Sequence, residues 1–103
     1  AATLRRAAAV HPIAAMQSEY SLWTRNPELG VLDACAELGV TFVAFSPVGR
    51  GFFADAALRP ETFHEADLRR GMPRFAPDNY AKNLARLEAA RQIARELGCS
   101  IPE

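Results

Sequence analysis

The sequence predicts an α/β fold in which helices cover parallel strands, and three observations support this. Residues 40–45 form a continuous apolar run rich in β-branched and aromatic side chains, which is typical of a strand buried on both faces. The elements follow the order helix, strand, helix, strand, the repeat of a parallel sheet. The second strand ends in a turn of Ser, Pro and two glycines, the edge where α/β folds bind ligands.

The first elements are short. An Ala-rich segment at residues 3–10 predicts a helix that stops at the His11-Pro12 pair. The apolar residues Ile13–Gln17 predict the first strand, and Ser18–Arg25 predict a loop.

A second helix should begin at Asn26, because an Asn N-cap is followed by proline and an acidic residue. Gly39 should end it in the C′ position. The strand Val40–Phe45 follows directly. The apolar face of this helix is predicted to contain Leu29, Leu32, Cys35 and Ala36.

The pattern weakens over Phe52–Pro77, where prolines and mixed charges predict a long loop with one short helix near residues 61–70. Asp78 should cap a long helix that runs to Leu97 and ends at Gly98. Its apolar face is predicted to contain Leu84, Leu87, Ala90, Ile93, Ala94 and Leu97.

The last four residues, Ser100–Glu103, have the spacing of a capping box. No helix follows this helix start in the sequence, so we expect the sequence to be truncated.

Composition limits the classes of function. The 103 residues carry 12 basic and 12 acidic side chains, which cancel, so no basic surface for nucleic acid is expected. The composition and length are those of at most one small soluble domain. No apolar run is long enough to span a membrane, and we expect a cytoplasmic location by default. Cys35 and Cys99 are expected to be free, buried thiols. His64 lies near two acids, but no second cluster has ligand spacing, so no metal site is predicted.

The turn after the second strand predicts an anion site. Gly49 and Gly51 allow close approach of the backbone to a ligand, and Arg50 adds a positive charge. A phosphate-bearing cofactor across the strand end fits this pattern. Each residue also has a simpler reading: the glycines could serve any tight turn, Arg50 could be a solvated charge, Phe45 a core aromatic, and Gln17 a partner of neighbouring backbone.

Four segments, in the same order along the chain, resemble the aldo-keto reductase family. They are Gln-Ser-Glu-Tyr-Ser-Leu-Trp at 17–23, Phe-Val-Ala-Phe-Ser-Pro-Val-Gly-Arg-Gly-Phe at 42–52, Pro-Arg-Phe at 73–75 and Asn-Tyr-Ala-Lys-Asn-Leu at 79–84. The resemblance covers essentially the whole chain, 1–103. It implies a partial aldo-keto reductase barrel domain of an NADP-dependent oxidoreductase. The implied fold is an incomplete (β/α)8 TIM barrel with about two parallel strands and three to four helices.

The resemblance also implies site residues. Ile13–Gln17 and Val40–Phe45 would be the sixth and seventh barrel strands. Gln17 would bond the nicotinamide carboxamide, and Phe45 would stack on the nicotinamide ring, where the family more often has Tyr. Contacts to the pyrophosphate would come from the turn, namely Ser46, Pro47, Val48, Gly49, Arg50 and Gly51. Tyr20 and Trp23 would either contact a small carbonyl substrate of unknown class or pack beneath their loop.

The catalytic Asp, Tyr, Lys and His of the family precede its sixth strand, so this chain is expected to hold no catalytic residue. Tyr20, Tyr80, Lys82, His11 and His64 should not replace them. The segment that grips the 2′-phosphate of the cofactor is also missing, so the preference for NADP(H) over NAD is implied by the family alone.

Two functions therefore stay open. The chain is either part of an NADPH-dependent carbonyl reductase that holds the nicotinamide and pyrophosphate, or an inactive remnant or interaction module stabilised by partner chains. Another α/β barrel with a phosphate turn, such as a flavin enzyme, fits less well. In either case two strands leave open sheet edges, so self-association is expected.

Overall fold

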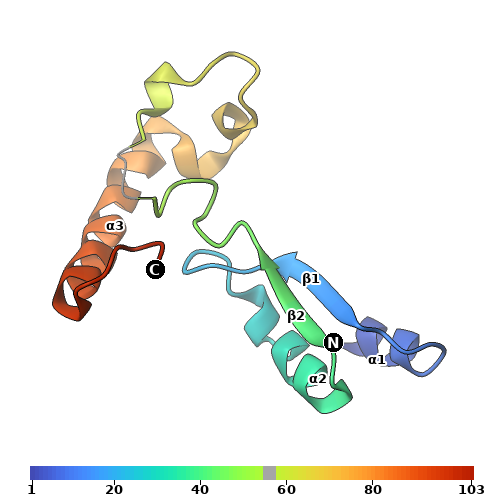
Figure 1. The fold of residues 1–103 in the computed structure, drawn as a ribbon. Coiled ribbons are helices and arrows are strands. Elements are labelled where there is room, and N and C mark those ends of the chain that lie inside the picture. Colours follow the sequence, from blue (N-terminus) through green and yellow to red (C-terminus); the bar gives the residue numbers. More distant parts are fainter. Residues whose placement is uncertain (55–57) are drawn as a thin grey trace. The chain divides into compact units, whose positions relative to one another are not determined.

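The computed structural model describes residues 1–54 and 58–103, drawn in Figure 1. The chain divides into two compact units, Ala1–Gly49 and Arg50–Glu103, which we call the N-terminal unit and the C-terminal unit. Each is described by itself below.

The N-terminal unit has the predicted order of helix, strand, helix, strand. Helix α1 (Ala2–Ala8) leads to strand β1 (Ala15–Glu19), and helix α2 (Val31–Leu38) leads to strand β2 (Thr41–Phe45). The strands pair in parallel, from Ala15 opposite Thr41 to Glu19 opposite Phe45, and lie side by side in Figure 1. The prediction of two parallel strands is confirmed.

Strand β1 starts and ends later than the predicted Ile13–Gln17. Pro12 has no N–H to donate, and the first backbone bond to the partner strand is accepted by Ala14, whose carbonyl receives the N–H of Thr41 at 3.0 Å. Ser18 and Glu19, predicted to lie in the loop, belong to the strand.

The core of this unit lies between the helices and one face of the sheet. Ala34 and Cys35 of α2 pack with Leu4 of α1 and with Val40. Five partly buried side chains pack against this cluster, namely Ile13, Met16, Val31, Leu38 and Phe42. Leu4 is thus the buried side chain that ties α1 to the rest of the unit.

The start of the second helix differs from the prediction. Asn26–Glu28 form a separate 3₁₀ helix, η1, and Asn26 makes no capping side-chain bond there. Gly30, at φ +100°, has the left-handed conformation that a right-handed helix cannot contain, so α2 begins only at Val31. The apolar stripe is therefore shifted from the one predicted, and Leu29 is 85% exposed. Gly39 ends the helix as predicted, with the Val40 N–H bonded to the Cys35 carbonyl in a Schellman motif.

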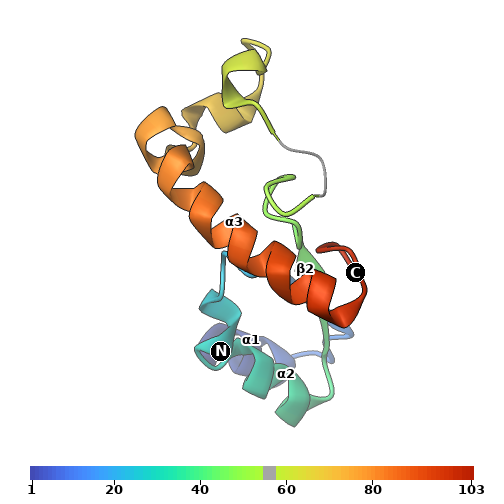
Figure 2. The ribbon, with the colours of Figure 1, turned by 90° about the vertical axis from the view of Figure 1, so that its left-hand side faces the viewer.

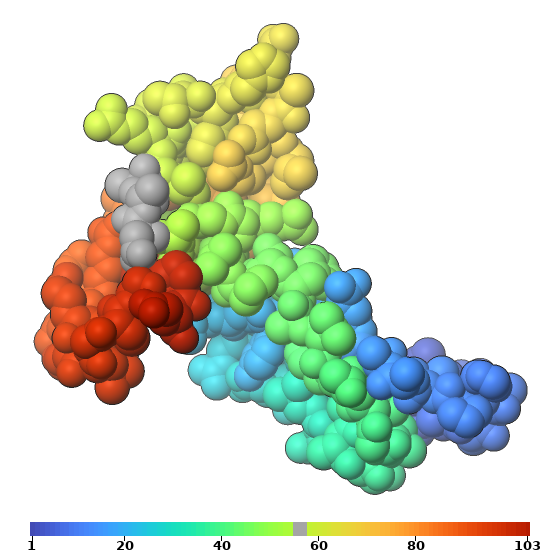
Figure 3. Space-filling view, in the orientation of Figure 1, coloured from blue at the N-terminus to red at the C-terminus, as the bar shows by residue number. Residues whose placement is uncertain are grey.

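The prediction that residues 40–45 are buried on both faces is wrong for this chain. Met16 and Phe42, paired in register, face the helices. Alternation along a strand then puts Val43 and Phe45 on the other face, and each is 39% exposed. Both strands can be seen at the surface of the unit in Figure 3. In the part of the chain that the structure describes, the sheet has two strands, and no element of this unit covers the second face.

The described residues of the C-terminal unit form three 3₁₀ helices and one long helix. These are η2 (Pro60–Thr62), η3 (Leu68–Gly71), η4 (Pro73–Phe75) and α3 (Pro77–Leu97), and Figure 2 shows α3 along its length. The predicted loop Phe52–Pro77 is thus built from short turns rather than around one helix at 61–70. Its residues 55–57 lie outside the described residues.

Aromatic side chains form the core of this unit. Phe52 and Phe75 are buried, with ring centroids 6.5 Å apart. Tyr80 of α3 packs on both, at 5.9 Å from Phe52 and 6.3 Å from Phe75. Its hydroxyl donates to the carbonyl of Leu58 at 2.7 Å. These contacts join the start of α3 to the turns before it.

Helix α3 departs from the prediction at its start and along its face. Pro77 fits the first helical position, so Ala76 is the N-cap and the helix begins one residue before Asp78, which makes no capping bond. The buried positions are Asn83, Leu87 and Ala94. Leu84, Ile93 and Leu97 are exposed by 41%, 59% and 74%, because the helix packs against the short η4 within this unit. Gly98 ends α3 as predicted.

Three smaller predictions can be compared with the structure. Both cysteines are free, but only Cys35 is buried, since Cys99 lies exposed after the end of α3. The Glu103 carboxylate accepts the backbone N–H of Ser100 at 2.9 Å, the reciprocal half of a capping box. None of the helices in the described residues is both long and apolar enough to traverse a lipid bilayer.

Candidate functional site

Gln17 and Phe45 lie on the same face of the sheet. Gln17 pairs with Val43, and Phe45 is two residues further along β2. Paired residues of a sheet share a face, and the face repeats every second residue. Strand spacing then places the two Cα atoms roughly 8 Å apart, on the face that the helices leave uncovered.

Both side chains are accessible on that face. Gln17 is exposed, and its amide makes no hydrogen bond to another described residue. Phe45 is exposed by 39%.

Glu19 is a neighbour that the sequence did not single out. It lies directly opposite Phe45 and, two residues after Gln17, shares its face. The Thr24 hydroxyl donates to its carboxylate at 3.1 Å. The predicted extent of β1, which ended at Gln17, hid this placement.

The first half of the turn begins at Ser46. Ser46 has φ +54°, an uncommon left-handed conformation for a residue with a side chain. The N–H of Gly49 donates to its carbonyl at 2.9 Å and closes a tight turn over Pro47 and Val48. Conformations of this kind cost about 1–3 kcal/mol each and gather at ligand sites.

The second half of the turn belongs to the C-terminal unit. Arg50 has φ +63° and Gly51 has φ +87°. With Gly49 at φ +58° before them, three successive residues are left-handed, and Arg50, which is not glycine, needs support from its surroundings. Arg69 gives that support: its Nη1 donates to the Arg50 carbonyl at 3.4 Å, and a Cβ added to Gly51 would lie 3.6 Å from the same nitrogen.

Arg69 is itself held by Asp67 and Phe63. Its Nη2 donates to one carboxylate oxygen of Asp67 at 2.6 Å, and its Nε to the other at 3.0 Å. Its guanidinium carbon lies 4.2 Å from the centre of the Phe63 ring, a cation–π contact. Sequence analysis missed this cluster, since an arginine two residues after an aspartate has no distinctive pattern.

The Asp67–Arg69 pair should make the stability of the C-terminal unit sensitive to acid. Hydrogen bonds from Arg69 lower the pKa of Asp67 from 3.8 to about 2. A lowered pKa stabilises the fold above the unfolded value, and this contribution is lost as pH falls through the folded value. Between about pH 4 and pH 2, unfolding free energy should therefore fall more steeply for the natural chain than for Asp67→Asn. Urea melts at several pH values in this range measure the unfolding free energy of both proteins. Parallel plots of that free energy against pH would contradict the lowered pKa of Asp67.

Tyr20 and Trp23, the predicted substrate contacts, lie on the loop after β1. The Tyr20 ring packs edge-on against Phe42 at 5.8 Å, and its hydroxyl donates to Glu28 at 2.8 Å. This bond to Glu28 is the main cause of a raised Tyr20 pKa. These contacts account for Tyr20 by packing within its unit. Trp23 is partly buried, and its backbone N–H donates to the Ser21 hydroxyl at 3.0 Å.

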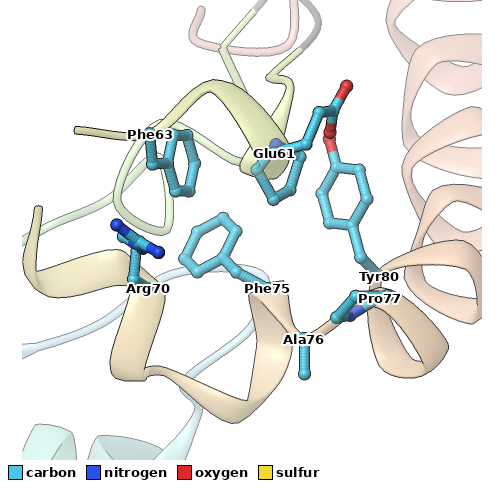
Figure 4. A pocket seen from close by; sticks show the side chains of 8 residues that line it. Glu61, Phe63, Arg70, Phe75, Ala76, Pro77 and Tyr80 are labelled. Atoms are coloured by element: carbon cyan, nitrogen blue, oxygen red, sulfur yellow. The ribbon is translucent and has the colours of Figure 1, made fainter. Parts of the chain in front are cut away.

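A pocket of about 390 Å³ lies on the C-terminal unit. Phe63, Phe75 and Tyr80 supply its aromatic walls, with Glu61 beside Tyr80 and Arg70 beside Phe75 (Figure 4). No predicted site residue lines it. Phe63 forms a wall of the pocket, and its ring also packs against the Arg69 guanidinium that binds the Arg50 carbonyl. The same side chain therefore contributes to the pocket and to the support of the turn.

The predicted site residues thus fall into two groups. The N-terminal unit brings Gln17 and Phe45 to one sheet face, and the left-handed Ser46 follows directly. The C-terminal unit holds Arg50 and Gly51 on the Arg69 cluster. Among the described residues, no group of three or more His, Cys, Asp or Glu side chains could hold a metal.

Comparison with known proteins gives the same family that the motifs suggest. The model of the "Aldo/keto reductase family" matches residues 1–103. The chain is 45% identical over 95 residues to a fission yeast protein (Schizosaccharomyces pombe) named "Aldo-keto reductase yakc [NADP(+)]". This alignment covers 89% of the present chain and 28% of the yeast protein. No solved structure matches the chain.

This chain belongs to the aldo/keto reductase family. It spans less than a third of the length of this yeast relative.

Proposed function

We propose that this chain supplies the nicotinamide and pyrophosphate contacts of an NADPH-dependent aldo-keto reductase that converts a small carbonyl compound to an alcohol. The observation that carries the proposal is the placement of Gln17 and Phe45 on one open sheet face, immediately before the left-handed Ser46. Family membership and the NADP(+) in the name of the yeast relative support it.

The residues on the sheet face fit a nicotinamide. A flat exposed ring such as Phe45 can stack on a pyridine ring, and stacking needs no hydroxyl. The amide of Gln17 has a donor and an acceptor, which match the two groups of a carboxamide. When bound, the reduced nicotinamide supplies a hydride to the carbonyl carbon. The roles of Gln17 and Phe45 are to orient the ring and fix which face it presents.

The turn fits a pyrophosphate. Arg50 brings a positive charge, and the left-handed backbone at Arg50 and Gly51 is the kind that turns main-chain N–H groups towards an anion. Pro47 and Val48, which precede them in the turn, would add further contacts to the pyrophosphate. The strands would thus bind the nicotinamide ring, and the turn would bind the pyrophosphate.

Proton donation to the developing alkoxide needs a general acid, which in this family comes from positions before the sixth strand. We therefore propose that turnover requires chain segments beyond the 103 residues. A second function is favoured by the open sheet: Val43 and Phe45 are 39% exposed, and both strands are edge strands in the described residues. On that basis the alternative that we propose is an inactive remnant or interaction module whose strands pair with a partner chain or a second copy.

Replacing Phe45 by alanine should weaken NADPH binding about two- to twelvefold, because stacking contributes about 0.5–1.5 kcal/mol beyond the contact area. Trp23, the one tryptophan of the chain, can report binding through energy transfer to the reduced nicotinamide. The same change should leave binding of 2′-phospho-ADP-ribose nearly unaltered, since that ligand has the diphosphate but lacks the nicotinamide.

The control is Leu97→Ala, which removes an apolar side chain that is 74% exposed at the C-terminal end of α3. It should bind both ligands as the natural chain does. Equal NADPH affinity for Phe45→Ala and the control would remove Phe45 as the stacking residue and favour the inactive module.

A further inference from the structure

We propose that Arg69 is a positioning residue that holds the second half of the pyrophosphate turn in its binding conformation. The inference rests on the proposed function for the identity of the ligand. It adds a residue outside the predicted turn, together with the residues that fix it. We call Phe63, Asp67 and Arg69 the arginine clamp.

The clamp leaves one side of the guanidinium for the turn. The Asp67 carboxylate accepts hydrogen bonds from Nε and Nη2 of Arg69. The Arg69 backbone N–H donates to the same carboxylate at 2.9 Å. Phe63 lies under the guanidinium plane. The remaining nitrogen, Nη1, points to the carbonyl of Arg50. The side chains of Asp67 and Arg69 are only 19% and 27% exposed, so the pair is partly shielded from water.

The turn needs such a support. Arg50 at φ +63° is in a conformation that costs a residue with a Cβ about 1–3 kcal/mol. The two hydrogen bonds to Asp67 fix the orientation of the planar Arg69 guanidinium. Its Nη1 can therefore reach the Arg50 carbonyl in only one direction. Loss of this bond should let the Arg50–Gly51 backbone relax and turn its N–H groups away from the diphosphate.

A purely electrostatic role for Arg69 makes a different prediction. If Arg69 acted only as a positive charge near the anion, removal of the negative charge of Asp67 would strengthen diphosphate binding. If Arg69 acts by position, Asp67→Asn loosens the clamp and weakens binding. The sign of one change therefore separates the two roles.

The experiment measures binding of 2′-phospho-ADP-ribose to the full chain and three variants. Arg69→Met should weaken binding about tenfold, the equivalent of one hydrogen bond to a charged group, and Asp67→Asn should weaken it several-fold. Arg70→Met is the matched control: it removes the neighbouring arginine of the same 3₁₀ helix, which lies beside Phe75 in Figure 4. Its binding should stay within a factor of two.

Backbone amide chemical shifts of the ligand-free chain give a second readout. Arg69→Met should move the resonances of Arg50 and Gly51, and Arg70→Met should not. Tighter binding by Asp67→Asn, or equal behaviour of Arg69→Met and Arg70→Met in both measurements, would overturn the proposal while the effect of Phe45→Ala still supports the reductase function. If the natural chain binds no nucleotide, the proposed function fails, and the amide shifts alone decide whether Arg69 positions the turn.

Discussion

Truncation of Phe75 to alanine should lower the free energy of unfolding of the C-terminal unit by about 3–5 kcal/mol. Phe75 is 3% exposed, and its ring contacts those of Phe52, Phe63 and Tyr80. Removal of the ring leaves a cavity where these three side chains meet. The loss of amide signals of α3 in a urea titration measures the effect.

Ile93→Ala in the same helix is the comparison. Ile93 was predicted to lie on the apolar face of α3 but is 59% exposed. Alanine is also the better helix former, so this change should alter stability by no more than about 0.5 kcal/mol. A similar cost for both variants would contradict the aromatic core described for this unit.

Replacement of Leu4 by alanine should destabilise the N-terminal unit by about 2–4 kcal/mol. Leu4 is the one residue of α1 among the buried residues of the core cluster, where it packs with Ala34, Cys35 and Val40. The Arg5–Glu37 ion pair, 2.6 Å between Nη2 and Oε2, also joins α1 to α2 but is exposed and contributes little. Without the Leu4 side chain, α1 should therefore detach.

Trp23 belongs to this unit, so its fluorescence during urea unfolding gives the measurement. Leu29→Ala provides the control within the same unit, since Leu29 is 85% exposed and should cost no more than about 0.5 kcal/mol. A larger loss for Leu29→Ala than for Leu4→Ala would support the helix that was predicted to begin at Asn26.

The parallel strands and the ends of the helices could be read from the sequence because local chemistry determines them. Gly39 and Gly98 end α2 and α3 as glycines in the C′ position do. Helix starts were less predictable. Pro27 and Pro77 both fit a first helical position, but the left-handed Gly30 stops the first from continuing into α2, and that conformation is not visible in the pattern.

Burial was the least predictable property. An apolar run such as Val40–Phe45 predicts a strand that is covered on both faces. The observed exposure of the strand depends instead on which elements are present to cover it. In the candidate site, Gln17 and Phe45 could be proposed from the sequence because they follow a family motif. Arg69 could not, because its contact with Arg50 joins positions 19 residues apart through tertiary folding.

The uncovered sheet face has a consequence for the energetics of any ligand bound there. Water has access to Gln17 and Phe45, so a hydrogen bond or a charge on that face acts in a medium of high dielectric constant and competes with hydration. Each contact is then weaker than the same contact in a closed barrel, where solvent is excluded. The 103-residue chain should accordingly bind nucleotide with modest affinity, and covering that face with further strands should strengthen every contact at once without changing any of the residues that make them.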